Sequence, residues 1–179
     1  SAGKGIAGVK LTGNSNTAVG KDAGLLLQGA AANNTLVGAL AGDAITTGGS
    51  NTAVGQASLT TLTTASYNTA MGLNSGLVLT TGEDNTLIGV SACTALTTGT
   101  LNVALGRNAL AAGAATNKNV AIGNNTLQSV SASSNVDSFN TAVGFSAGGA
   151  VTTGGQNTLI GGLAGDALTT ASENTAVGY

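Results

Sequence analysis

A five-residue unit that begins with asparagine and ends with glycine recurs ten times along this 179-residue chain. Residues 51–55 spell its commonest form, NTAVG, and most copies follow the previous one after 17 residues. The asparagines are Asn16, Asn34, Asn51, Asn68, Asn85, Asn102, Asn119, Asn140, Asn157 and Asn174. The closing glycines are Gly20, Gly38, Gly55, Gly72, Gly89, Gly106, Gly123, Gly144, Gly161 and Gly178. A short fixed period of this kind predicts a solenoid or another stacked array.

The composition excludes a core built from large side chains. Aromatic residues make up 2% of the chain and charged residues 7%, while 29 residues are glycine and none is proline or histidine. The hydrophobic share of 42% is nevertheless too high for a disordered chain. A fold that depends on small side chains and backbone hydrogen bonds is expected, which favours stacked β-structure. The net charge of −2 gives no basis for binding nucleic acid, and no apolar run approaches the roughly 18 residues of a membrane span.

The third and fourth positions of every unit, counted from its asparagine, are both apolar. Because side chains alternate between the two faces of a strand, this pattern predicts a strand that is covered on both faces. We expect the fourth position to pack inside the turn against a large apolar residue at position twelve. The third position and the glycine would then face a second copy of the chain, so that Ala53→Asp is expected to break assembly. The predicted fold is all-β, a parallel β-roll or β-helix solenoid with 17-residue turns.

The asparagine that begins each unit and the glycine that ends it are each expected to have a structural role. Stacked asparagines would form an amide ladder at a spacing of about 4.8 Å. The glycine would serve either a positive φ or a close backbone approach, and the sequence leaves both alternatives open.

We interpret residues 1–179 as one repeat domain, with an incomplete first turn over 1–15 and strands from 16 to 178. The turn over 119–139 is expanded to 21 residues, and such insertions map to exposed loops. A receptor- or sugar-binding loop is one interpretation of this region, and a tolerated bulge with aromatics that shield a strand edge is the other. The candidate binding residues are Asn135, Asp137, Phe139 and Phe145. No capping turn is expected at either end, so the chain would be a piece of a longer fibre or would polymerise end to end.

Enzyme chemistry is not expected. The absence of histidine excludes a catalytic triad and an imidazole-based metal site. The acidic residues do not recur at a ligand spacing, as a calcium-binding β-roll would require. We interpret Cys93 as a small apolar core residue, and we predict no catalytic, cofactor-binding or metal-binding residue.

The residues 119–123, NVAIG, resemble the N-x-A-I-G unit in the head repeats of trimeric autotransporter adhesins. The longer pattern of NTAVG, L-T-T-G and NTAVG again is similar to repeats of phage tail-fibre-like proteins and bacterial surface fibres. The resemblance covers residues 16–179 and implies three parallel, left-handed β-rolls about a common axis, outside the cell or on a virion. It favours a homotrimeric structural fibre that assembles with itself. The alternatives are an adhesin module that binds a cell-surface receptor or glycan, and an ice-binding solenoid that uses its threonine rows.

Overall fold

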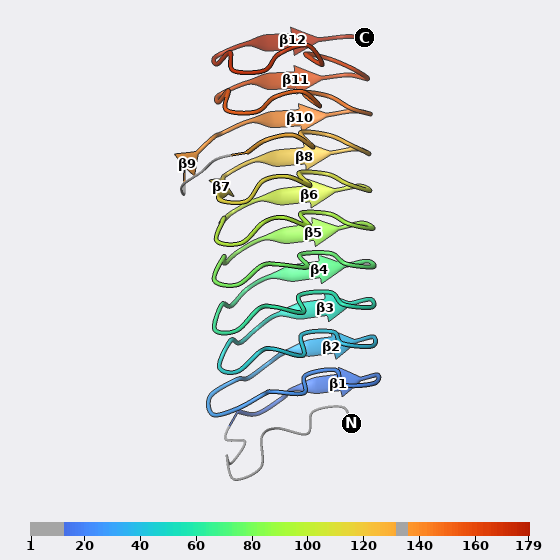
Figure 1. Ribbon diagram of the computed structural model, residues 1–179, viewed down its shortest axis with the longest axis vertical. Helices are drawn as coiled ribbons and strands as arrows, with labels where there is room; N and C mark the ends of the chain where they lie inside the picture. Colours follow the sequence, from blue (N-terminus) through green and yellow to red (C-terminus); the bar gives the residue numbers. More distant parts are fainter. Residues whose placement is uncertain (1–12, 132–135) are drawn as a thin grey trace.

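The computed structural model describes residues 13–131 and 136–179, which form a single column of stacked coils (Figure 1). The predicted fold class is confirmed as an all-β parallel solenoid with a 17-residue spacing, and the described residues contain no helix. Residues 1–12 of the predicted incomplete first turn lie outside the described part.

Each copy of the repeat contributes one three-residue strand to a ten-stranded parallel sheet. In spatial order the strands are β1 (Thr17–Val19), β2 (Thr35–Val37), β3 (Thr52–Val54), β4 (Thr69–Met71), β5 (Thr86–Ile88), β6 (Val103–Leu105), β8 (Val120–Ile122), β10 (Thr141–Val143), β11 (Thr158–Ile160) and β12 (Thr175–Val177). Every strand pairs with the next at the same repeat position, as Ala53 does with Ala70. Equivalent side chains therefore stack in rows along the column.

The expanded turn adds a second, two-stranded parallel sheet beside the column (Figure 1). Its strands are β7 (Thr116–Asn117) and β9 (Val136–Asp137). The Thr116 hydroxyl lies 2.8 Å from that of Ser138, inside this junction. The extra residues thus leave the main register unbroken, because β8 still pairs with β10.

The structure reverses the predicted assignment of the two strand faces. The third position is the one that points into the core, where Ala53 and Leu87 are fully buried. The fourth position points outward, and Val19 is 58% exposed. The reason is that position twelve already brings a large side chain such as Leu62 into a narrow interior, so the strand contributes its smaller row. Ala53→Asp would therefore bury a carboxylate in the chain's own core and would not test an interface.

The core is filled by complementary sizes at positions three and nine. Where position three is leucine, position nine is small: a Cβ added to Gly42 would lie 2.7 Å from Leu36 Cδ2. Where position three is alanine, position nine can be leucine, as in the pair Ala53 and Leu59. The space at Gly76 is shared, because a Cβ there would lie 2.8 Å from Leu59 Cδ2 and 2.9 Å from Leu87 Cδ1. Leucines from successive coils therefore interlock along the column, and the expectation of a core without large side chains was wrong, because the repeat places leucines at the few inward positions.

Truncating an inward leucine should cost more than truncating its outward neighbour. Leu87→Ala removes a fully buried side chain from a coil whose ninth position is already small, and we expect it to lower the free energy of unfolding by about 2–5 kcal/mol. Ile88→Ala, on the other face, is expected to lower the chain's own stability by less than about 1.5 kcal/mol. Urea unfolding followed by circular dichroism at several protein concentrations measures both. If Leu87→Ala and Ile88→Ala lowered the free energy of unfolding equally at every protein concentration, the observed orientation of the strand would be contradicted.

Candidate functional site

The asparagines of the repeat join successive coils, and eight of the ten also hold their own coil closed. The Nδ2 of Asn51 donates to the carbonyl oxygen of Ala65 at 2.9 Å, which closes its own coil, and to Oδ1 of Asn34 at 3.1 Å. Its Oδ1 accepts a hydrogen bond of 3.0 Å from the backbone nitrogen of Asn68. From Asn34 to Asn157 these side chains are buried. Their amide groups are therefore occupied within the chain and give it cohesion along its axis.

The closing glycines satisfy both interpretations that the sequence left open. Their φ angles lie between 130° and 139°, a region that side-chain-bearing residues rarely adopt. A Cβ on Gly89 would also lie only 2.5 Å from the backbone oxygen of Gly106 in the next coil. Positive φ and close approach are thus required at the same residue.

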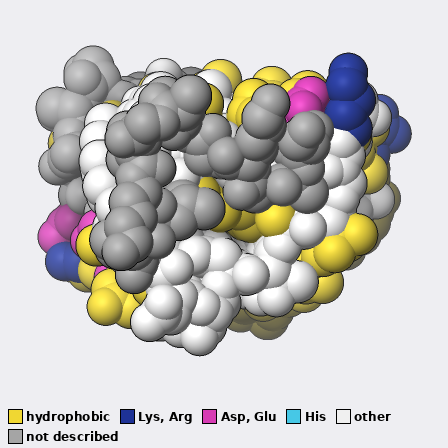
Figure 2. All heavy atoms as spheres, turned by 90° about the horizontal axis from the view of Figure 1, so that it is seen from below, with side chains coloured by type: hydrophobic (Ala, Val, Ile, Leu, Met, Phe, Trp, Pro, Cys, Tyr) yellow, Lys and Arg dark blue, Asp and Glu magenta, His cyan; other side chains and the backbone are white. Residues whose placement is uncertain are grey.

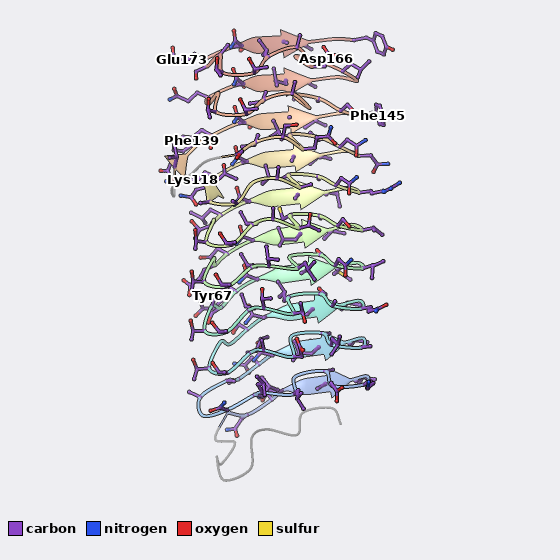
Figure 3. All side chains as sticks on the ribbon, in the orientation of Figure 1. Tyr67, Lys118, Phe139, Phe145, Asp166 and Glu173 are labelled. Carbon is purple, nitrogen blue, oxygen red and sulfur yellow. The ribbon has the colours of Figure 1, made fainter. Side chains whose placement is uncertain are left out.

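The structure does not bring the predicted binding residues together. Asn135 lies outside the described residues. Figure 3 shows Phe139 on one side of the column and Phe145 on the other, at opposite ends of β10. Both rings are exposed, at 49% and 59%. The two phenylalanines therefore do not lie in one patch of the chain.

Asp137 and Phe139 instead share a partner that the sequence did not reveal, Lys118. The Lys118 Nζ lies 2.6 Å from the Asp137 carboxylate and 5.1 Å from the centre of the Phe139 ring. Hydrogen bonds from Lys118 and Asn117 hold the pKa of Asp137 below its usual value. Because Lys118 ends one coil and Asp137 belongs to the next, these contacts clamp the expanded turn to the column.

The second and fourth positions of the ten strands form a continuous outward surface, which we call the outer face. The fourth position is aliphatic throughout, in the row Val19, Val37, Val54, Met71, Ile88, Leu105, Ile122, Val143, Ile160 and Val177. The second position is threonine in eight strands and valine in β6 and β8. No charged residue occupies either row. The threonine hydroxyls of this face have no hydrogen-bond partner among the described residues.

Charged side chains lie apart from this surface. They occupy a few places at the margin in Figure 2, where hydrophobic and uncharged atoms make up most of the described surface in view. Lys21 and Arg107 follow the closing glycines, and Asp43 lies on a loop, where it accepts a hydrogen bond from Thr60. The outer face is therefore a regular apolar surface without charged side chains.

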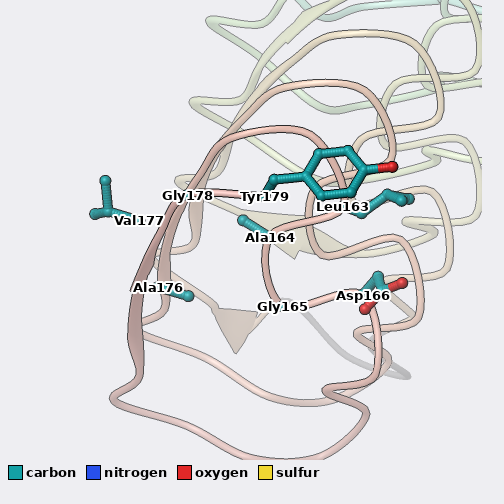
Figure 4. Close-up of a pocket in the computed structure, with 8 residues that line it drawn as sticks. All are labelled: Leu163, Ala164, Gly165, Asp166, Ala176, Val177, Gly178 and Tyr179. Atoms are coloured by element: carbon teal, nitrogen blue, oxygen red, sulfur yellow. The ribbon is translucent and has the colours of Figure 1, made fainter.

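The other candidate sites carry no recognisable chemistry. Residues around Leu163, Asp166 and Tyr179 line an open hollow beside the last described coil (Figure 4), with Asp166 as its one carboxylate. Cys93 is fully buried, and burial raises the pKa of its thiol, so it is an inert core residue. The described residues contain no group of three or more side chains suited to hold a metal ion. Among them there is also no helix of the length and hydropathy that a membrane crossing requires.

Comparisons of this chain with protein-family models, with curated protein sequences and with solved structures found no match.

Proposed function

We propose that this chain is the structural subunit of a fibre or filament, a rigid β-solenoid shaft that assembles with copies of itself into a homotrimer. We place it outside the cell, on a cell surface or on a virion. The observation that carries the proposal is the outer face, an aliphatic and charge-free row that runs over all ten strands. A row of this length on a free chain would leave exposed apolar surface that soluble monomers rarely carry.

The column has the mechanical character of a shaft. Nine steps of about 4.8 Å give a sheet about 43 Å high. Every step is held by backbone hydrogen bonds along the strand and by an asparagine on the coil below it, as Asn102 is held by Asn85. Bending such a column would break hydrogen bonds on one side of several coils at once. Stiffness along the axis is therefore built into each repeat.

The outer face approaches the size of a stable interface. From each asparagine to its closing glycine the face spans four steps of about 3.3 Å, or about 13 Å. With the height of the sheet this gives about 570 Å², of the same order as the roughly 800 Å² that each partner buries in a specific complex. Three copies that turn this face toward a common axis would cover all of it, in keeping with the resemblance to trimeric fibres.

The particle's mass and shape test the proposal. Light scattering should give three times the 16.9 kDa mass of the chain, or higher multiples where trimers join. Electron microscopy should show rods that are three coils across. A monomer at every accessible protein concentration would contradict the proposal.

One observation favours a second candidate, an ice-binding solenoid. The outer face presents rows of threonine hydroxyls without partners in the described structure, beside rows of methyl groups, at the regular spacing of the sheet. This function requires a monomer with the face open to water. Ice-growth inhibition by a monomeric sample, lost in Thr69→Lys/Thr86→Lys, would favour it over the fibre.

A further inference from the structure

We infer that self-association is anchored at a central belt, formed by Met71, Ile88 and Leu105 of the outer face together with Leu73 and Val90 at the sixth position beside it, and that the partner seated on it is a second copy of this chain. The inference rests on the proposed function, and it assigns most of the binding energy of self-association to a specific part of the column. The belt lies on β4, β5 and β6 and on the residues that follow β4 and β5.

The belt is the place where two neighbouring rows are both large and aliphatic. Met71, Leu73, Val90 and Leu105 are each 40–44% exposed, and Ile88 between them is half-buried. Leu73 and Val90 occupy successive coils that are hydrogen-bonded, since the Ser91 nitrogen donates to the Leu73 oxygen. The five side chains therefore make one contiguous patch.

The surface changes above and below the belt. Below the belt the fourth position is valine in β1, β2 and β3 and the sixth position is Gln56. At its upper end Arg107 follows Leu105 in the same coil, and the fourth row continues with Ile122, Val143 and Ile160. An apolar centre with a polar margin is the arrangement in which a few large residues carry most of the binding energy. The belt is thus expected to be the anchor, with the valine rows adding complementary area.

The shape of the belt points to a copy of the same chain. Its side chains stand in rows about 4.8 Å apart, with shallow grooves between them. A second solenoid of this sequence presents rows of the same spacing, so the rows of one copy can lie in the grooves of another along the whole face. The absence of charge from the second and fourth rows removes the basis for attracting an acidic or basic partner.

The chain contains one methionine, so Met71 reports directly on the belt. Dilute hydrogen peroxide converts an exposed methionine to its sulfoxide. We expect Met71 to oxidise at least about 10-fold more slowly in the oligomer than in samples diluted to monomer, as measured by mass spectrometry. Equal rates in the two states would overturn the inference, because the 40% exposure of Met71 in the free chain would then persist on assembly.

A charge-insertion pair identifies the face independently. Met71→Lys/Val90→Lys places two cations on exposed positions, where a single chain can solvate them. We expect the protein concentration needed for assembly to rise at least about 100-fold, while the circular dichroism spectrum stays that of wild type. The control Ala112→Lys/Val136→Lys adds the same charge at exposed positions outside the outer face and should assemble like wild type.

The outcomes separate the two proposals. If wild type assembles and the belt pair assembles equally well, the belt is not the anchor and the fibre proposal stands. If wild type stays monomeric, both fail. Should the lysine pair not fold, Met71→Ala/Val90→Ala provides a milder test, with a smaller loss of assembly expected and an unchanged assembly concentration counting against the belt.

Discussion

Gly89→Ala is expected to lower the free energy of unfolding by about 3–6 kcal/mol, a large part of the stability of a domain of this size. The substitution forces alanine to a φ of +139°. It also places a methyl group 2.5 Å from the backbone oxygen of Gly106, which is held in the ladder and cannot move aside. We expect β5 and β6 to separate, so that the column unfolds at lower urea concentration and in a broader transition by circular dichroism.

Two other glycines separate the causes of this loss. Gly178 has a similar φ of +130° but nothing within 4 Å of an added Cβ, so Gly178→Ala isolates the backbone strain. Gly162 lacks a positive φ and would meet only the Tyr179 ring at 3.6 Å, so Gly162→Ala should be nearly neutral. The loss in the free energy of unfolding should therefore be largest for Gly89→Ala, smaller for Gly178→Ala and smallest for Gly162→Ala. A Gly89 variant as stable as the Gly162 variant would refute the close-approach argument.

The repeat made the stacking of this fold predictable. A constant 17-residue step places the same residue types over one another in every coil, so a parallel in-register sheet follows from the period alone. The apolar residues at position twelve were expected in the interior, and side chains such as Ile45 and Leu79 are buried there. The expanded turn was predicted to bulge, because four extra residues cannot fit the period.

The orientation of the strands was not predictable in the same way. Alternation shows that positions three and four lie on opposite faces, but not which face is inside. The interior width decides this, and it depends on left-handed residues at positions seven, nine and seventeen of each coil. Asparagine, aspartate, serine or glycine fills many of these positions, but others hold residues such as Leu40, Leu59 and Tyr67, whose side chains carry no turn signal.

The separation of the candidate binding residues was hidden in the sequence for a related reason. Phe139 and Phe145 are close in sequence, yet a strand separates them and sends them to opposite sides of the column. Lys118 was missed because it lies 19 residues before Asp137, a distance that brings residues together only once the expanded coil is stacked. In a solenoid, neighbours in space are found one period away, and an insertion hides that relation.

Asn85→Asp is expected to destabilise the chain by about 3–5 kcal/mol at pH 7. The Nδ2 of Asn85 donates to the carbonyl oxygens of Gly99 and Glu83 and to Oδ1 of Asn68, and the side chain is buried. A carboxylate of the same shape would face these oxygens with negative charge and without a donor. Burial and repulsion would raise the folded-state pKa of the new carboxyl above its unfolded value of about 3.9.

The pH dependence of the stability lost in Asn85→Asp distinguishes the effect of a buried negative charge from that of a poorly fitting side chain. With the folded pKa raised, the penalty relative to wild type is full above the folded pKa and shrinks as the pH falls toward about 3.9, because the protonated acid can donate to the Gly99 oxygen. Urea titrations of variant and wild type at pH 7 and pH 4 should show about half of the penalty recovered. The exposed Asn124, whose Oδ1 only accepts a hydrogen bond from the Arg107 nitrogen, provides the control, and Asn124→Asp should change stability by less than about 0.5 kcal/mol at either pH. A penalty at position 85 that stays constant with pH would show that the carboxyl had reached water, and the buried amide ladder would then not be what holds successive coils together.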